Sequence, residues 1–152
     1  MSGYNITYNE NGISLDQSKY ITEILDRFGM TNCKTAVTPS NTNQRLSISM
    51  CATSDEEKRE MKGVPYQEAV GSLLYLVHGT RPDIAFAVND VSRFNSNYGR
   101  TYWTAVKRIF RYLKGTIELK MCYRKSEKPA LMGYTDADWT SDVDKRSCTG
   151  YA

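Results

Sequence analysis

Two aspartates near the end of the chain, Asp136 and Asp138, have the type and spacing that most directly suggest chemistry. On a β-strand, residues two positions apart point to the same face, so their carboxylates could share one weakly held Mg²⁺ ion with water in its remaining octahedral positions. The alternative is a pair of solvated acids at a strand end, followed by Asp142 and Asp144 in a turn. We favour the solvated pair, because Mg²⁺ is seldom captured by two carboxylates without a substrate phosphate.

A stripe of lysines and arginines forms a second candidate site, on a helix predicted from Thr101 to about Lys114 and just beyond it. One interpretation is a solvated helix face whose C-terminal cations are favoured by the helix dipole. The other is contact with phosphates, since clustered Lys and Arg provide the sequence-independent part of nucleic-acid affinity. Both interpretations stay open. The candidate nucleic-acid-binding residues are Lys107, Arg111, Lys114, Arg124 and Lys125.

The charge distribution singles out the same region. The 152-residue chain has a formal net charge of only +3. Residues 100–130 contain nine Lys or Arg against two Glu, a net of +7, whereas residues 1–99 and 131–152 each have a net charge of −2. The basic character is therefore local.

Composition is that of an ordinary globular domain, with 40% hydrophobic and 24% charged residues. No stretch approaches the roughly 18 apolar residues of a membrane span, and the N-terminus lacks a signal-peptide pattern. We therefore expect an intracellular, soluble product with no membrane partner. The four cysteines form no C-x-x-C motif, and His78 is the single histidine of the chain. This pattern argues against a zinc site and favours reduced structural thiols.

The N-terminal third is predicted to contain a β-hairpin, a helix and a long loop. Apolar residues alternate on both sides of an Asn11-Gly12 turn, and an amphipathic helix then ends at Gly29. A lone hairpin is marginal in water, and we expect this one to lack the larger sheet that it needs. The polar stretch from Met30 to about Thr53 is typical of a mobile surface loop.

The middle of the chain is predicted to be a small α-rich module. A capping-box pattern at Ser54 begins a short charged helix, and Pro65 and Pro82 each begin an apolar one. The basic helix follows, with Gly115 as its stop. Residues 119–123 and 131–135 have the pattern of strands.

Five motifs stand in a fixed order along nearly the whole chain. They are Gly12-Ile13-Ser14-Leu15-Asp16-Gln17-Ser18-Lys19-Tyr20-Ile21; Tyr66 to Val70 followed by Gly71-Ser72-Leu73-Leu74-Tyr75-Leu76; Thr80-Arg81-Pro82-Asp83-Ile84; Trp103 followed by Arg108-Ile109-Phe110-Arg111-Tyr112-Leu113-Lys114-Gly115-Thr116; and Tyr134 to Trp139. Each motif alone is weak, but five in register are a strong signal. In this order they resemble the Ty1/copia-type retrotransposon Pol polyproteins, which are reverse transcriptases and ribonucleases H.

The resemblance implies an α+β fold in two parts. Residues 1–125 resemble the end of the reverse transcriptase, with a β-hairpin remnant of the palm and an α-rich thumb and connection. Residues 130–152 resemble the start of a truncated ribonuclease H-like domain, an incomplete β-hairpin in which Asp136 matches the first catalytic carboxylate. The family's polymerase aspartates sit in a Tyr-x-Asp-Asp turn, and no two aspartates are adjacent in this sequence.

The function expected from this resemblance is that of a non-catalytic fragment of a copia-type reverse transcriptase and ribonuclease H. It would need no cofactor of its own, although the family uses Mg²⁺, and it would have at most weak, non-specific affinity for an RNA or DNA template–primer backbone. The alternative is an incomplete stretch of an active RNA-directed DNA polymerase and ribonuclease H. The oligomeric state and the choice between cytoplasm and nucleus are not predicted.

Overall fold

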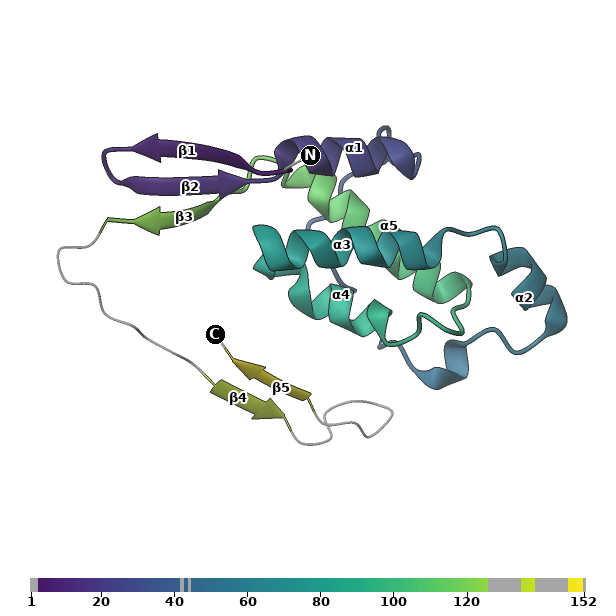
Figure 1. Ribbon diagram of the computed structural model, residues 1–152. Coiled ribbons are helices and arrows are strands. Elements are labelled where there is room, and N and C mark those ends of the chain that lie inside the picture. Colours follow the sequence, from purple (N-terminus) through teal and green to yellow (C-terminus); the bar gives the residue numbers. More distant parts are fainter. Residues whose placement is uncertain (1–2, 42, 44, 126–134, 139–147, 152) are drawn as a thin grey trace.

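The fold combines helices with two small antiparallel sheets, which agrees with the predicted α+β class. The computed structural model describes residues 3–41, 43, 45–125, 135–138 and 148–151. Figure 1 shows the elements. In chain order they are β1 Asn5–Asn9, β2 Gly12–Asp16, α1 Ser18–Arg27, η1 Ile48–Met50, α2 Asp55–Met61, α3 Tyr66–Gly79, η2 Pro82–Ile84, α4 Ala85–Ser92, α5 Arg100–Gly115, β3 Met121–Arg124, β4 Thr135–Asp138 and β5 Cys148–Tyr151.

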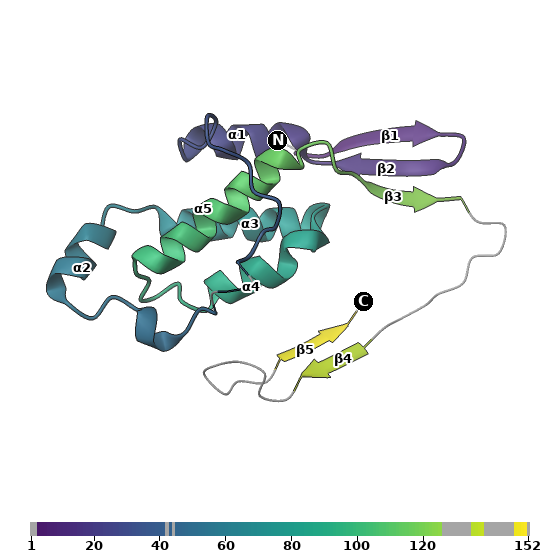
Figure 2. The same cartoon turned by 180° about the vertical axis from the view of Figure 1, so that it is seen from behind.

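Helix α5 is the centre of the helical part, because it contacts α1, α3 and α4 (Figure 2). Its buried face fits the predicted amphipathic pattern, and α3 and α4 bury the apolar residues that oppose it. Leu74 lies in the apolar stretch of α3, but it is only half-buried, at the edge of this core. None of the helices in the described ranges is long and apolar enough to cross a membrane.

Most helix boundaries follow the predicted local signals. Ser54 and Glu57 form the capping box, in which the Glu57 backbone N–H donates to Ser54 Oγ at 3.1 Å. Gly29, with φ of +65°, ends α1 in the left-handed conformation that glycine adopts without strain. The helix predicted to begin at Pro82 is divided, because Pro82 opens the short 3₁₀ turn η2 before α4 begins at Ala85.

The long polar loop is more anchored than its sequence indicates. Met30, Leu46 and Ala52 are buried, although they are too far apart to produce a periodic pattern. The Tyr102 hydroxyl of α5 also donates to the Ser47 carbonyl. The loop is thus tied to the helical core at several points, while its predicted mobility stays a prediction.

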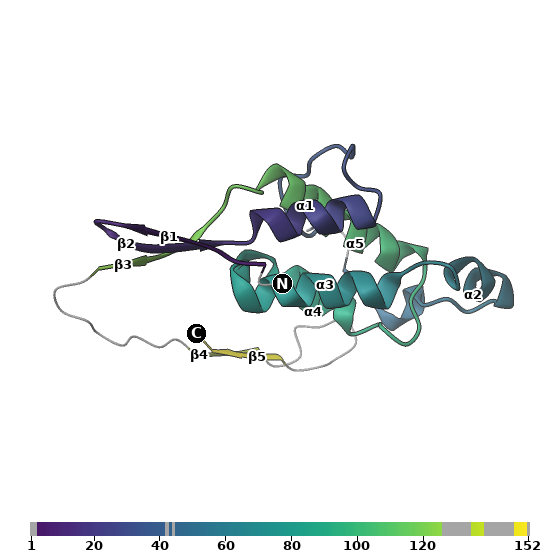
Figure 3. The ribbon, with the colours of Figure 1, turned by 45° about the horizontal axis from the view of Figure 1, so that its top comes forward.

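The N-terminal hairpin has a sheet partner, which corrects the expectation that it would stand alone. Strand β3 pairs antiparallel with β2, with Tyr123 opposite Ile13, and gives a three-stranded sheet of order β1-β2-β3. Gly12 permits this pairing, since a Cβ on it would lie only 2.0 Å from the Tyr123 carbonyl oxygen. Figure 3 shows this sheet extending away from the helices.

A buried carboxylate fixes the sheet to the start of α1. Asp16 is 4% exposed, and its Oδ1 accepts hydrogen bonds from Asn5 Nδ2 at 2.8 Å and from Ser18 Oγ at 2.7 Å. Lys120, just before β3, lies 3.3 Å from Oδ2. Burial alone would raise the pKa of Asp16, but these hydrogen bonds outweigh it and lower the pKa to about 2.

A buried arginine fixes the C-terminal end of α5. Arg81 is 1% exposed, and its Nε and Nη2 bind the two carboxylate oxygens of Asp83 at 2.9 and 2.7 Å. Its Nη1 and Nη2 also donate to the carbonyl and hydroxyl of Thr116, at 3.1 and 2.7 Å. Burial would raise the pKa of Asp83, yet the hydrogen bonds and charge of Arg81 hold it below its usual value.

Replacing Arg81 should destabilise the fold far more than replacing an exposed arginine. Arg81→Met removes the guanidinium donors from Asp83 and Thr116 and leaves Asp83 with only the Tyr112 hydroxyl as a side-chain donor, which should lower the free energy of unfolding by about 3 kcal/mol. Arg100→Met is the matched control, because it removes an exposed ion pair with Glu60 and should cost less than about 1 kcal/mol. Urea denaturation measures both, and equal losses would contradict the assigned role of Arg81.

The contribution of Asp16 to stability should depend on pH. Its pKa is lower in the folded than in the unfolded chain, so its stabilisation is complete above about pH 4 and is lost as the pH falls toward 2. Asp16→Asn should cost about 2 kcal/mol at pH 7 and much less at pH 2.5. Asp26→Asn, at an exposed site on α1, serves as the control. A cost for Asp16→Asn that does not change between these pH values would refute the account.

Candidate nucleic-acid interface

The outward face of α5 carries four cations. The opposite face is fixed in the core by the buried Tyr102, Val106, Ile109, Phe110 and Leu113. Because that face is buried, the helix must turn its basic residues toward the surface, where each of them is half-buried. We call this group the α5 basic face; its members are Lys107, Arg108, Arg111 and Lys114.

An irregular segment of the long loop, residues 33–38, crosses the α5 basic face, and we call it the strap. Lys114 Nζ donates to the Cys33 carbonyl at 2.7 Å. Arg111 Nε donates to the Lys34 carbonyl, also at 2.7 Å, and the Arg111 carbonyl accepts from the Ala36 N–H at 3.2 Å. Two of the predicted phosphate-binding residues therefore already hold backbone carbonyls of the same chain.

Arg108 is a member of the α5 basic face that the sequence pattern did not single out. Its Nε donates to the Thr38 carbonyl at 3.2 Å, and its Nη2 donates to Thr38 Oγ1 at 2.8 Å. It lies one residue after Lys107 and so falls outside the helical spacing of four and then three residues that relates Lys107, Arg111 and Lys114. Its partner, 70 positions earlier, leaves no signal in the sequence around the helix.

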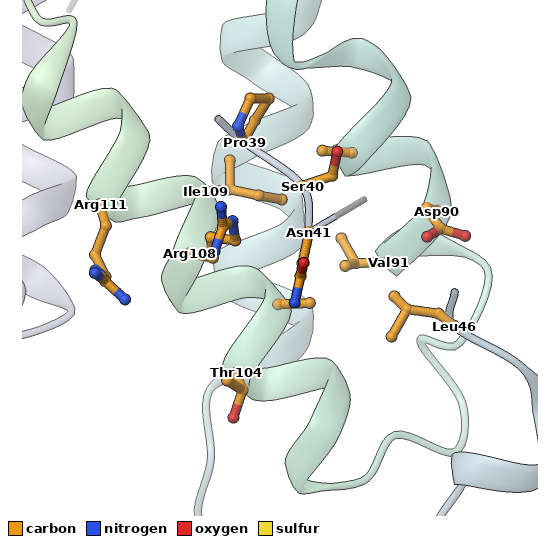
Figure 4. Close-up of a pocket in the computed structure, with 12 residues that line it drawn as sticks. Pro39, Ser40, Asn41, Leu46, Asp90, Val91, Thr104, Arg108, Ile109 and Arg111 are labelled. Atoms are coloured by element: carbon orange, nitrogen blue, oxygen red, sulfur yellow. The ribbon is translucent and has the colours of Figure 1, made fainter. Parts of the chain in front are cut away.

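A small pocket lies between α5, α4 and the residues that follow the strap (Figure 4). Arg108 and Arg111 reach it from α5, and Pro39, Ser40 and Asn41 approach it from the loop. Its volume is about 110 Å³. Ligand sites usually measure roughly 300–1,000 Å³, so this pocket is too small to hold a nucleotide. We regard it as a packing gap next to the strap.

The α5 basic face keeps its positive charge. The acceptors that Arg108, Arg111 and Lys114 bind in the strap are backbone carbonyls and the Thr38 hydroxyl, which carry no net charge. Within the described ranges no carboxylate forms a salt bridge with any of the four cations. By contrast, Arg81, Arg93 and Arg100 are each paired with an acid. The cations on this one face of α5 are thus electrostatically available to an anionic partner.

The remaining predicted basic residues lie elsewhere. Arg124 ends β3, opposite Gly12, and the Lys125 N–H donates to the Asn11 carbonyl at 2.8 Å. Both are exposed, at the end of the sheet that points away from the helices (Figures 1 and 2). The structure therefore does not join them to the α5 basic face, so the predicted basic residues lie on two separate surfaces.

The two candidate metal ligands lie on one strand, as the sequence predicts. Asp136 and Asp138 belong to β4, where they face Gly150 and Cys148 of β5. Residues 131–134, part of a predicted strand, and the acids at 142 and 144 fall outside the described residues. No group of three potential metal ligands occurs among the residues that the structure describes. Metal binding here stays a prediction.

Comparison with known proteins finds relatives of which this chain spans only a small part. The Pol polyprotein of transposon TNT 1-94 from Nicotiana tabacum is 52% identical over 138 residues, which are 90% of this chain and 10% of the relative. The Pol polyprotein of transposon RE2 from Arabidopsis thaliana is 36% identical over 141 residues, 92% of this chain and 9% of the relative.

A yeast relative extends the match beyond plants. The putative transposon Ty5-1 protein of Saccharomyces cerevisiae is 30% identical over 149 residues, 97% of this chain and 46% of that protein. No family model and no solved structure matches. The shared sequence nevertheless runs through nearly all of the chain in each case. The chain is thus a homologue of one segment of the retrovirus-related Pol polyproteins of copia-type transposons.

Proposed function

We propose that this segment binds the sugar–phosphate backbone of nucleic acid, weakly and without sequence preference, through the α5 basic face. The observation that carries the proposal is the set of four cations with no carboxylate partner among the described residues. Charge of this kind supplies the non-specific part of nucleic-acid affinity. A template–primer of RNA and DNA is the partner that fits a Pol polyprotein.

The dimensions of α5 support this role. Lys114 lies seven positions after Lys107, a rise of about 10 Å along a helix. Phosphates of one strand follow one another every 3.4 Å or so along a duplex axis, so this face can meet about two or three of them. Binding through so few phosphates is weak.

The strap prepares the side chains for such contacts. Hydrogen bonds from Arg108 and Arg111 to strap carbonyls fix two long side chains that would otherwise lose rotamer freedom on binding. A guanidinium has five N–H donors, and these bonds use only part of them. Among the described residues the remaining donors have no acceptor, which leaves them available to phosphate oxygens.

Within the parent polyprotein, we assign residues 1–125 to the palm end, thumb and connection of the reverse transcriptase, and residues 130–152 to the start of the ribonuclease H-like domain. The segment itself catalyses neither polymerisation nor hybrid cleavage, and it requires no cofactor. Two-metal catalysis needs several carboxylates from different elements, whereas this sequence has no adjacent pair of aspartates and offers Asp136 alone as a match.

A charge reversal on α5 should abolish binding. The variant combines Lys107→Glu, Arg111→Glu and Lys114→Glu, which preserves helix propensity because Glu is a good helix former. The charge-matched control places three Glu at the C-terminal end of α2, at Lys58 and Arg59 in the helix and at Lys62 directly after it, which are all exposed. Fluorescence anisotropy with a duplex should show binding by the wild type and by the control, with the control weakened only through net charge.

The salt dependence tests the mechanism in the same assay. When the logarithm of the wild-type binding constant is plotted against the logarithm of the salt concentration, the slope should be roughly −2 to −3, about −0.9 per phosphate contacted. No detectable wild-type binding at low salt would sink the proposal. Binding that the α5 variant retains and the α2 control loses would assign the interface to another surface.

A further inference from the structure

The three-stranded sheet has one face made only of apolar residues. The register places Ile6 opposite Leu15, Tyr8 opposite Ile13, and Ile13 in turn opposite Tyr123, so all of them share a face. Leu15 also pairs with Met121. We call this the apolar sheet face; it consists of Ile6, Tyr8, Ile13, Leu15, Met121 and Tyr123. The opposite face is polar or small and includes Thr7, Ser14, Asp16, Cys122 and Arg124.

The apolar sheet face is largely uncovered. Tyr8 is 74% exposed, Tyr123 57%, Ile6 54% and Ile13 39%. A tyrosine side chain buries roughly 150–250 Å² when it is covered completely, so the face exposes on the order of 400–500 Å² of mostly apolar surface. That is near the upper limit for the largest patch on a monomer, and such patches mark interaction sites.

We infer that the apolar sheet face is the docking surface for the adjoining chain of a Pol polyprotein, which covers it with an apolar surface of its own. The matched stretch is 10% of the tobacco relative and 9% of the Arabidopsis relative, so in those proteins the same stretch is joined to about nine times as much further chain. An antiparallel sheet with one apolar and one polar face normally packs its apolar face against a second layer. The inference is independent of nucleic-acid binding by α5.

The area favours a covalently linked partner over a second copy. Two copies packed through this face would bury about 1,000 Å² in total, which is the lower limit for a specific interface. Separate copies also lose translational and rotational freedom on association, a cost of at least about 4 kcal/mol. A segment of the same polypeptide docks at an effective concentration in the millimolar range, so the same small surface is sufficient.

The experiment compares cysteine accessibility on the two faces of β3, in the isolated chain and in a polyprotein. The control retains native Cys122, which lies on the polar face and is exposed, with Cys33, Cys51 and Cys148 replaced by Ser. The reporter has all four cysteines replaced and carries Tyr123→Cys on the apolar face. Each is placed in the isolated chain and in the tobacco TNT 1-94 polyprotein, where this chain replaces its counterpart. The measurement is the rate of maleimide labelling.

Both sites should react rapidly in the isolated chain, which should sediment as a monomer. In the polyprotein, the cysteine of Tyr123→Cys should react at no more than about one tenth of its rate in the isolated chain, because labelling then requires local opening. Cys122 should keep its rate within about a factor of two, since the inference leaves the exposed part of the polar face around Cys122 uncovered in the same folded state. This difference between adjacent residues of one strand is the expected result.

Three results would overturn the inference. The first is equally fast labelling of Tyr123→Cys in the isolated chain and in the polyprotein. The second is that Tyr123→Cys and Cys122 are slowed to the same extent in the polyprotein. The third is an isolated chain that is a dimer already protected at Tyr123→Cys, which would make a second copy the occupant. Ser72→Cys, at a buried site in α3, checks that the polyprotein is folded. If that site reacts, the tobacco polyprotein with its own segment is used, with cysteines at the aligned positions.

Discussion

Helix α5 has one apolar face that packs in the core and one basic face at the surface, and the rest of the structure depends on this division. Its apolar face contacts α1, α3 and α4, so the helical core can close only with the basic residues turned outward. The outward cations then hold the strap by hydrogen bonds to backbone carbonyls. One amphipathic helix therefore both organises the core and creates the surface on which the proposed function rests.

Buried polar residues fix the elements around this helix. Arg81 joins the turn after α3 to Thr116, just beyond the C-terminal end of α5, and Asp16 joins the sheet to the start of α1. Gln17 adds a third connection, since its Oε1 accepts a hydrogen bond from Thr80 Oγ1 at 3.0 Å while its side chain is 1% exposed. A buried polar group is costly unless it is paired, so the contacts of Arg81 and Asp16 specify one arrangement of helices and sheet, whereas Gln17 Nε2 is buried with no hydrogen-bond partner among the described residues.

The sequence predicts the parts of this fold that depend on local signals. The capping box at Ser54, the glycine at the end of α1 and the amphipathic period of α5 all act within a few residues. The pairing of β2 with β3 was missed, because the paired residues Gly12 and Arg124 are more than a hundred positions apart and neither side chain signals the other.

The candidate site shows the same limit. Spacing alone identifies Lys107, Arg111 and Lys114 as one stripe on α5, and the structure places them on one face. The sequence could not identify Arg108 or the strap, because the strap offers mainly backbone carbonyls, which every residue possesses. Nor could it show that Arg124 lies on a separate surface, since that follows from strand pairing.

The most direct test of the central claim is nuclear magnetic resonance of the isotope-labelled chain during titration with a nucleic-acid duplex at low salt. Phosphate contact at the α5 basic face should shift the amide signals of the strap and of residues 107–114, and these shifts should disappear as salt is raised. The amides of α2, whose Lys58 and Arg59 are exposed, should remain unchanged. Shifts that are confined to the sheet, or that resist high salt, would contradict the account.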